Sequence, residues 1–484
     1  MALGELRFRD ALPRWSELLT LAVVRGLASF AAYASGFRAL SDDDYARITI
    51  AQRFASAPHF DPSGSSWLPG PFWIYGEAFS VLGRELWVAR ATAIALALCA
   101  TFLVFAAARV LGLGRPGSLF AAALTALLPY SALLGLAAVP EVPCAALILF
   151  GAATLCRPNF ELRLLGGGAL AYACLSRYEA WPVALVFALY SLWDARKNPQ
   201  LVFAVLWALF GAAAWLVIGH VEHGDALFFI ARVTSYKRAL GGEHGSLAAR
   251  ILEYPKLLVL AEPELSLLVV LALCSFWKSR APRFERGYGR PLLALLASLS
   301  FLIAGSVQDG VPTHHAARVL LPIWFFGGAL CGDAFELWSG RWQRGPGLAA
   351  FAGAAALALL GVAARPRLLP REGFADRSAE LRVGIAAKTE PGLLVIDTPD
   401  YGYFAIEAAF GYPGRAIPLV DHDPRHAPSQ DPFVSPEALN AVLQALGADS
   451  LVTTSAHAAV AAQICRERWH GPMFSLFECR SSPR

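Results

Sequence analysis

The feature that most constrains the fold is a series of long apolar runs between residues 17 and 364. A helix needs about 20 mostly apolar residues to cross a bilayer. Only 16% of the residues are charged, whereas soluble domains are about a quarter charged. We therefore predict a mainly α-helical, polytopic membrane protein with about eleven transmembrane helices. The expected spans are 17–37, 88–109, 118–137, 140–156, 163–176, 180–194, 200–219, 257–277, 291–307, 317–337 and 346–364.

Basic residues lie between alternate runs, and this pattern indicates an orientation. With the N-terminus in the cytoplasm, every short inside connection is basic, as the positive-inside rule requires. These connections carry Arg109 and Arg115, Arg157 and Arg163, Arg196 and Lys197, the basic residues of 278–290, and Arg341 and Arg344. The sequence thus predicts a multi-pass protein of the inner (cytoplasmic) membrane whose first run is an uncleaved helix. The net charge of +4 is too small to indicate a nucleic-acid partner.

After about residue 365 the long apolar runs give way to short strands and helices. We expect strands at 393–397, 417–420, 451–454 and 474–477, and helices near 401–410, 436–446 and 456–467. This alternation favours an α/β domain with a largely parallel sheet. We therefore divide the chain into a transmembrane catalytic domain, 1–365, and a small extracytoplasmic α/β domain, 366–484. Whether Cys465 and Cys479 in the second domain form a disulfide or remain free thiols is left open.

Several common nucleotide and metal motifs are absent from the sequence. It contains no Walker A motif, no GxGxxG after a strand, no HExxH and no CxxC. Gly166-Gly167-Gly168 lies inside an apolar run, so we interpret it as a site of close helix packing rather than a phosphate loop.

Three consecutive aspartates, Asp42, Asp43 and Asp44, follow the first apolar run. Ser41 is a good helix N-cap, and Asp44 three residues later is an acidic variant of the capping box, so capping accounts for Asp44. Capping does not account for three carboxylates at a membrane surface, where charge is costly. The pattern favours a general base or a metal ligand in a polar cleft.

A second motif follows at 66–76, and the order of the two motifs is informative. The first is Asp42-Asp43-x-Tyr45-Ala46, and the second is Trp67-x-Pro69-x-Pro71-x-x-x-Tyr75. Weaker matches are Leu128-Pro129, Glu141 in Pro140-Glu141-Val142-Pro143, the stretch Ser176–Ala180, and Arg318-Val319-Leu320-Leu321-Pro322. Over residues 15–365 this arrangement resembles the GT-C superfamily of integral-membrane glycosyltransferases. It is most similar to bacterial relatives of protein O-mannosyltransferases and lipid A aminoarabinose transferases.

The resemblance implies transfer of a sugar from a polyprenyl-phosphate donor to an acceptor hydroxyl on the outer face. The acceptor is a lipid, a polysaccharide or a protein. Asp42 and Asp43 match the acids that act on the acceptor, and we favour this pair jointly, with Asp42 first. A hydroxyl is a weak nucleophile that needs a positioned base, whereas a lipid phosphate leaves as a stabilised anion held by cations. We expect inversion at the anomeric carbon and no obligatory metal.

Candidate substrate-binding residues each have a second interpretation. Arg177 and Arg318 are expected to hold the phosphate. The second interpretation is that Arg177 pairs with Glu179 and that Arg318 anchors its helix at the membrane interface. Glu141 is a second acid or a helix-capping residue. Lys237 is a phosphate ligand or part of a solvated loop, and His314 with His315 line the donor site or, less favoured, bind a metal. Trp67 and Tyr75 stack on sugar or lie in the aromatic belt, and Tyr178 and Glu179 complete the set.

Two other functions fit parts of the pattern. A polysaccharide polymerase or ligase uses a similar donor but places its catalytic groups in a later outer loop. A transporter or flippase of lipid-linked saccharides predicts charges at mid-span and two symmetric halves. Most charges here lie at the ends of the runs, with Arg25 and Glu179 as exceptions, so the transferase is favoured.

Overall fold

The computed structural model describes residues 8–239, 246–279, 287–309, 315–341, 376–425 and 431–479, with isolated positions between 353 and 364. The chain divides into two compact units. The first consists of Met1–Phe37, Ser65–Pro71 and Ala93–Leu369, and the second of Arg38–Gly64, Phe72–Thr92 and Pro370–Arg484. The expected domain boundary near 365 falls in a stretch that is not described, so it remains a prediction.

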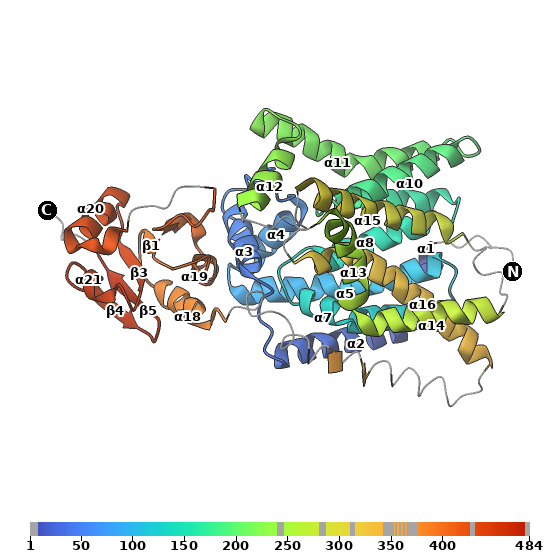
Figure 1. Cartoon of the computed structure of the whole chain (residues 1–484), viewed down its shortest axis with the longest axis horizontal. Coiled ribbons are helices and arrows are strands. Elements are labelled where there is room, and N and C mark those ends of the chain that lie inside the picture. Colours follow the sequence, from blue (N-terminus) through green and yellow to red (C-terminus); the bar gives the residue numbers. More distant parts are fainter. Residues whose placement is uncertain are drawn as a thin grey trace. The chain divides into compact units, whose positions relative to one another are not determined.

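The first unit is helical throughout its described residues (Figure 1). It contains α1 (Phe8–Ala11), α2 (Trp15–Ala34), most of α5 (Leu86–Val110), α6 (Arg115–Leu127), α7 (Pro129–Leu134), α8 (Glu141–Thr154), α9 (Phe160–Cys174), α10 (Ala180–Ala195), α11 (Leu201–His223), α12 (Phe228–Ala239), α13 (Leu247–Leu260), α14 (Pro263–Ser279), α15 (Gly289–Asp309), the 3₁₀ helix η2 (Ala316–Leu320) and α16 (Leu321–Arg341).

Each expected span within the described residues coincides with one of these helices or with two in succession. Among the described residues, five helices are long and apolar enough to cross a membrane, or six if α13 and α14 form one span bent by 84°. The expected number of about eleven is therefore not confirmed, because several helices such as α8 and α10 are apolar but short. The expected span at 346–364 lies outside the described residues apart from isolated positions.

The expected span at 118–137 is broken at Leu128-Pro129, where α6 ends and α7 begins. Proline lacks an N–H and cannot continue the ladder, so carbonyls at the break need other donors. Arg25 of α2, which is 1% exposed, supplies one of them. Its Nη1 donates to the Ala126 carbonyl at 3.2 Å, and its Nη2 donates to the Ser131 carbonyl of α7 at 2.9 Å. The mid-span arginine thus satisfies a carbonyl at the break and holds α7 to α2.

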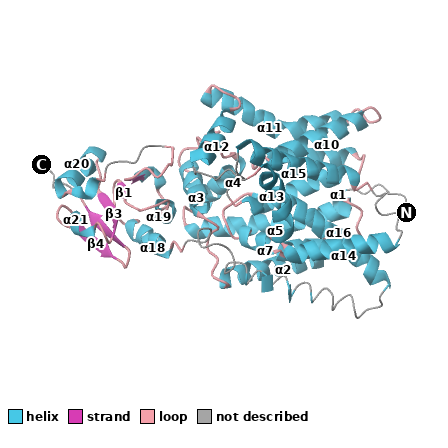
Figure 2. Cartoon of the chain, viewed as in Figure 1, coloured by secondary structure: helices cyan, strands magenta, loops and turns pink. Residues whose placement is uncertain are grey.

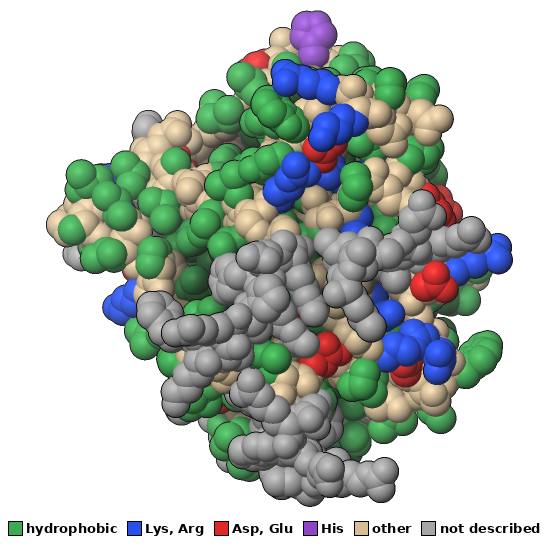
Figure 3. All heavy atoms as spheres, turned by 90° about the vertical axis from the view of Figure 1, so that its right-hand side faces the viewer, with side chains coloured by type: hydrophobic (Ala, Val, Ile, Leu, Met, Phe, Trp, Pro, Cys, Tyr) green, Lys and Arg blue, Asp and Glu red, His purple; other side chains and the backbone are tan. Residues whose placement is uncertain are grey.

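The ends of the helices that carry the expected inside connections lie together in the first unit. Four side-chain contacts join them, and Figure 3 shows Lys and Arg side chains gathered on one face of the molecule. The contacts are Arg115 with Glu17 at 3.3 Å, Arg157 with the Val110 carbonyl at 3.0 Å, Arg163 with Asp194 at 2.7 Å, and Arg290 with Asp194 at 2.6 Å.

Small residues allow α9 to approach its neighbours closely. A Cβ built on Gly166 would lie 2.2 Å from Thr154 Oγ1, and one on Gly167 would lie 2.6 Å from the Ala204 carbonyl of α11. A Cβ on Gly168 would have no neighbour within 4 Å. The interpretation of this triplet as a packing site therefore applies to its first two glycines.

We predict that Gly167→Ala destabilises the protein by about 1–3 kcal/mol, because the methyl group forces α9 away from the backbone of α11. Thermal unfolding in detergent micelles measures the effect. Gly168→Ala is the matched control in the same helix, and it should be neutral or gain about 0.5–1 kcal/mol from the lower backbone entropy of alanine. Equal stability of the two variants would contradict the close approach of α9 and α11.

The second unit combines helices with a small sheet (Figure 2). It contains α3 (Asp42–Phe54), most of α4 (Gly70–Leu82), the start of α5, α18 (Ser378–Ala387), β1 (Leu394–Ile396), α19 (Tyr403–Phe410), η4 (Pro413–Arg415), β2 (Ala416–Pro418), η5 (Pro432–Val434), α20 (Pro436–Leu446), β3 (Ser450–Thr454), α21 (Ala458–Ala461), β4 (Arg466–His470) and β5 (Phe474–Glu478).

The sheet has the order β2-β1-β3-β5-β4 and a helical layer on each face. Strand β1 is parallel to β2 and β3, whereas β5 is antiparallel to β3 and β4. Val383 of α18 and Ile406 and Phe410 of α19 pack on one face, and Leu439 and Leu443 of α20 pack on the other. The four expected strands are present, and the sheet is parallel in its first three strands.

One part of the expected pattern in this unit is wrong. The expected helix at 456–467 ends after α21, and residues 466–470 form the edge strand β4. Strand β4 has no alternating apolar pattern, because most of its side chains are exposed. The disulfide between Cys465 and Cys479, with a Cα–Cα distance of 4.5 Å, joins the start of β4 to the end of β5. This bridge resolves the alternative that the sequence left open.

Candidate functional site

The first turn of α3 carries the three aspartates. Asp44 is fully buried, and its Oδ2 accepts the backbone N–H of Leu40 at 2.5 Å. The expected capping box is not formed, because Ser41 makes no side-chain cap hydrogen bond and the Asp44 carboxylate binds the N–H of the residue before Ser41. Asp42 and Asp43 are half-buried. The bond to Leu40 accounts for Asp44 alone, which leaves the other two acids for another role.

Asp42 is held by Arg377, which lies 335 residues away in sequence. Arg377 Nε donates to Asp42 Oδ1 at 2.9 Å, and Nη2 donates to Oδ2 at 2.7 Å. The remaining donors reach Glu380 at 2.9 Å and both oxygens of Asp400 at 3.1 and 3.0 Å. A guanidinium has five N–H donors, and all five are used here. The forked pair with Asp42 is the geometry in which arginine and carboxylate interact most strongly.

The charges of this network are mutually stabilised. Burial lowers the pKa of the Arg377 guanidinium, but hydrogen bonds and attraction from Asp42 and Asp400 outweigh burial and raise it. Partial burial raises the pKa of Asp400, but hydrogen bonds from Arg377 and the Gly402 N–H hold it below its usual value. Both groups are therefore ionised near neutral pH.

The far end of α3 is fixed by α19. Gln52 Nε2 donates to the carbonyls of Ala408 at 3.0 Å and Arg84 at 2.9 Å. Arg53 lies 3.3 Å from Glu407, whose side chain is 1% exposed. Burial raises the pKa of Glu407 to about 7, although Arg53 opposes the shift. Helix α3 is thus anchored to the C-terminal segment at both of its ends.

We predict that Glu407 makes the protein less stable as pH rises from about 5 to 8. Its pKa is about 7 when folded against an ordinary value of 4.5, so the folded state binds the proton more tightly. The tighter proton binding stabilises the folded state fully at pH values below the pKa of the unfolded state, and this stabilisation is lost as pH rises through 7. The free energy of unfolding falls by about 3 kcal/mol over this range. Thermal unfolding across this range measures the loss. Glu407→Gln should remove this dependence and be more stable than wild type at pH 8, and an unchanged pH profile would contradict the assignment.

Four charged side chains form a separate group in the first unit, at the helix ends opposite the basic connections. Glu141 begins α8 and is 3% exposed. Its Oε1 lies 2.8 Å from Arg177 Nη1 and 3.3 Å from Arg318 Nε. Arg177 Nε also donates to Glu179 Oε1 at 2.7 Å. The structure therefore brings together four expected site residues in a group of two arginines and two glutamates with no net charge.

The motif at 66–71 packs beside this group through Tyr178. The Tyr178 hydroxyl donates to the Ser66 carbonyl at 2.8 Å and accepts the Trp215 Nε1–H at 3.1 Å. The Gly70 N–H donates to the Leu175 carbonyl at 2.9 Å. Trp67 lies in this segment and is half-buried. The segment is therefore held on the loop between α9 and α10.

The other expected residues are placed as follows. His315 precedes η2 with a left-handed φ of 51°, and its carbonyl accepts the Arg318 N–H at 3.1 Å. Tyr75 lies in α4 within the second unit and is 4% exposed. Lys237 belongs to α12, but its side chain is outside the described part, as is the whole of His314.

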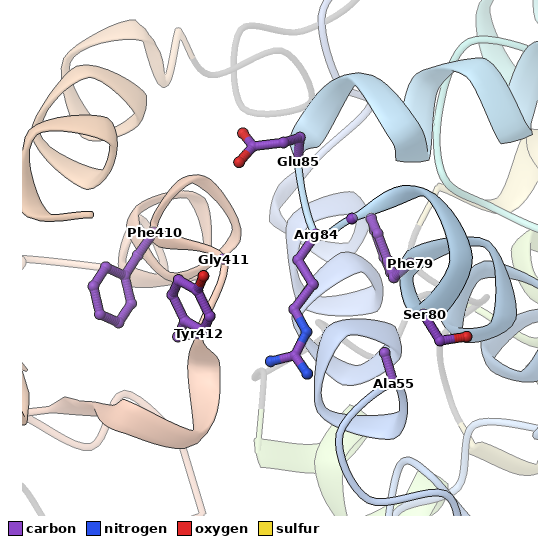
Figure 4. Close-up of a pocket in the computed structure, with 9 residues that line it drawn as sticks. Ala55, Phe79, Ser80, Arg84, Glu85, Phe410, Gly411 and Tyr412 are labelled. Atoms are coloured by element: carbon purple, nitrogen blue, oxygen red, sulfur yellow. The ribbon is translucent and has the colours of Figure 1, made fainter. Parts of the chain in front are cut away.

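A cavity of 370 Å³ lies within the second unit, where α3, α4 and α19 end (Figure 4). Arg84 runs along it, and its guanidinium carbon lies 5.7 Å from the centre of the Tyr412 ring. None of the expected site residues lines this cavity. Carbonyls at helix C-termini carry partial negative charge, which accounts for an arginine at this position. We therefore do not assign the catalytic site to the cavity.

Arg377 and Asp400 are the site residues that the sequence analysis did not identify. Asp400 accepts the Gly402 N–H at 2.8 Å just before α19. Its contact with Arg377 has no local signal, because Arg377 lies in an unpatterned stretch before α18. Among the described residues, no group of three or more His, Cys, Asp or Glu side chains is placed to hold a metal ion. The expectation of metal independence remains a prediction.

Solved structures similar to this chain include two crystal structures of ArnT from Cupriavidus metallidurans, one bound to undecaprenyl phosphate and one in the apo state. The first is 14% identical, covers 97% of this chain and 99% of that chain, and has a TM-score of 0.62. The second is 14% identical, covers 96% and 99%, and has a TM-score of 0.59. The sequence matches no protein-family model and no curated protein. The likeness shows that this chain shares the fold of these two structures, in agreement with the expected polytopic membrane fold.

Proposed function

We propose that this protein is a membrane glycosyltransferase that moves a sugar from a polyprenyl-phosphate donor to an acceptor hydroxyl. The observation that carries the proposal is the likeness of nearly the whole chain to ArnT, one structure of which is bound to undecaprenyl phosphate. Asp42 and Asp43 of the second unit are the candidate bases, and Arg177 and Arg318 of the first unit are the candidate phosphate ligands.

The proposed reaction is a single displacement at the anomeric carbon. The acceptor oxygen forms a bond to this carbon, while the bond from the carbon to the phosphate oxygen breaks. The electron pair leaves with the lipid phosphate, and the acceptor proton passes to a carboxylate of the Asp42–Asp43 pair. The products are a glycoside of inverted configuration and polyprenyl phosphate. No general acid is needed because the leaving group is already a stabilised anion.

The arginines of the first unit are suited to the phosphate. Arg177 uses Nε and Nη1 for Glu179 and Glu141, so its Nη2 has no protein partner within the described residues. The side chain is 13% exposed. Arg318 lies on the other side of Glu141. Charge-assisted hydrogen bonds from such donors hold phosphate oxygens more strongly than neutral ones do.

We further propose an inner-membrane protein with a cytoplasmic N-terminus and an extracytoplasmic C-terminal segment. The clustering of the basic helix ends in the first unit supports this orientation, because cytoplasmic loops carry an excess of Lys and Arg. The Cys465–Cys479 disulfide supports it independently, because structural disulfides persist in oxidising compartments.

We predict that wild-type protein in nanodiscs releases polyprenyl phosphate from one member of a panel of polyprenyl-phosphate sugars, with a membrane extract as the acceptor source. Asp42→Asn/Asp43→Asn should lower turnover by about 100- to 10,000-fold while the protein stays folded, because general-base catalysis contributes that much. Mass spectrometry of the lipid and NMR of the glycoside measure the reaction. Failure of a folded wild type with every donor would favour a transporter, and retention of the anomeric configuration would exclude single displacement.

We predict that Arg177→Gln mainly weakens donor binding. The variant loses the Nη2 donor, and a charge-assisted hydrogen bond contributes about 1.5–3 kcal/mol, so KM for the donor should rise by about 10- to 100-fold. Initial rates at varied donor concentration measure the change. Arg163→Gln is a control arginine of the same helix bundle, bound to Asp194 at the opposite helix ends, and its donor KM should stay unchanged. An unchanged donor KM in Arg177→Gln would contradict the phosphate role.

A further inference from the structure

Arg377 couples the C-terminal segment to the acidic first turn of α3. Both Asp42 and Arg377 belong to the second unit, and their forked contact has distances of 2.9 and 2.7 Å. Arg377 is itself fixed by Glu380 of α18 and by Asp400 in the loop before α19. The guanidinium is 10% exposed, so it is part of the packed structure rather than a solvated side chain.

From this geometry we infer that Arg377 is a positioning residue for the transfer reaction, which fixes Asp42 and with it the acidic first turn of α3 that supplies the proposed base. The inference rests on the proposed function. Both Asp42 oxygens accept hydrogen bonds from one guanidinium, so a proton on Asp42 would disrupt the forked pair. Asp43 is the adjacent half-buried acid on the same turn. A fixed Asp42 therefore orients the turn that presents Asp43.

The position of the turn matters because proton transfer requires close approach. A base must lie within hydrogen-bond reach of the proton, about 2.6–3.2 Å. A misplacement of about 1 Å costs on the order of 100-fold in rate. The opposite end of α3 is fixed separately by Gln52 and Arg53, so loss of Arg377 frees the acidic end while the helix stays docked.

The test compares Arg377→Gln, Asp42→Asn, the Arg377→Gln/Asp42→Asn double variant and Asp42→Asn/Asp43→Asn, each as full-length protein in nanodiscs. We expect Arg377→Gln and Asp42→Asn to lower kcat by about 100-fold each, with donor KM nearly unchanged. The double variant should be no slower than either single one, because both changes break the same contact. Asp42→Asn/Asp43→Asn should be slower than all three, because it removes both candidate bases. Arg377→Lys, which keeps the charge but not the fork, should recover part of the rate.

Two further variants separate positioning from loss of folding. Asp400→Asn weakens the hold on Arg377 at a side chain that is 50% exposed, and it should lower kcat by about 3- to 10-fold in a stable protein. Lys388→Gln breaks another ion pair of the same unit, that of Lys388 with Glu85, and should keep the wild-type rate. If Arg377→Gln fails to fold, Asp400→Asn and Arg377→Lys carry the test.

Specific results would overturn the inference. Wild-type kcat in Arg377→Gln or Asp400→Asn would remove the positioning role, as would additive losses in the double variant. If the wild type transfers sugar and Arg377→Gln does so equally well, only the positioning role fails. If the wild type transfers no sugar from any donor, the proposed function fails, and the positioning role fails with it.

Discussion

The energetic cost of removing charge from water governs both charged groups of this protein. A buried ion costs several kcal/mol unless close partners compensate it. Glu141 is compensated by Arg177 and Arg318 in the first unit, and Arg377 is compensated by three carboxylates in the second. Arg25 is compensated without a carboxylate. Its partners are backbone carbonyls and the Ser131 hydroxyl beside the helix break. In each case the partners are supplied by helix ends, so compensation of charge also fixes where those ends lie.

The charge balance of the first group suits a site that binds and releases an anion. Two arginines are paired with two glutamates, so the cations are compensated within the protein. Under the proposed function, a phosphate binds Nη2 of Arg177 without breaking the existing pairs. A group of unpaired arginines would bind the anion more tightly, but it would also hold the released lipid phosphate and slow turnover.

The sequence predicted those parts of the structure that depend on local pattern. Apolar runs located the helices, and alternating short strands located four strands of the sheet, because burial imposes these periods directly. The edge strand β4 was not predicted, since its exposed side chains carry no such period. The acids of α3 were recognised by their motif, yet Arg377 was not, because ion pairs between distant segments leave no trace in one sequence. The break at Pro129 was not predicted, since 118–137 was expected to be one span, and the contact of Arg25 with the Ala126 carbonyl depends on the packing of α2.

The same reasoning explains why the acidic turn depends on a sheet more than 300 residues later in the chain. Strand β1 lies between β2 and β3, and the loop that follows it carries Asp400. Thr398 Oγ1 donates to the Asp400 carbonyl at 2.8 Å, and the Gly402 N–H donates to the Asp400 carboxylate, so this loop has little freedom. Asp400 orients Arg377, and Arg377 orients Asp42. Each link is a short, directional hydrogen bond, so a disturbance of β1 reaches the first turn of α3 through three residues. In this protein the α/β segment is therefore part of the support of the proposed catalytic turn rather than an independent appendage.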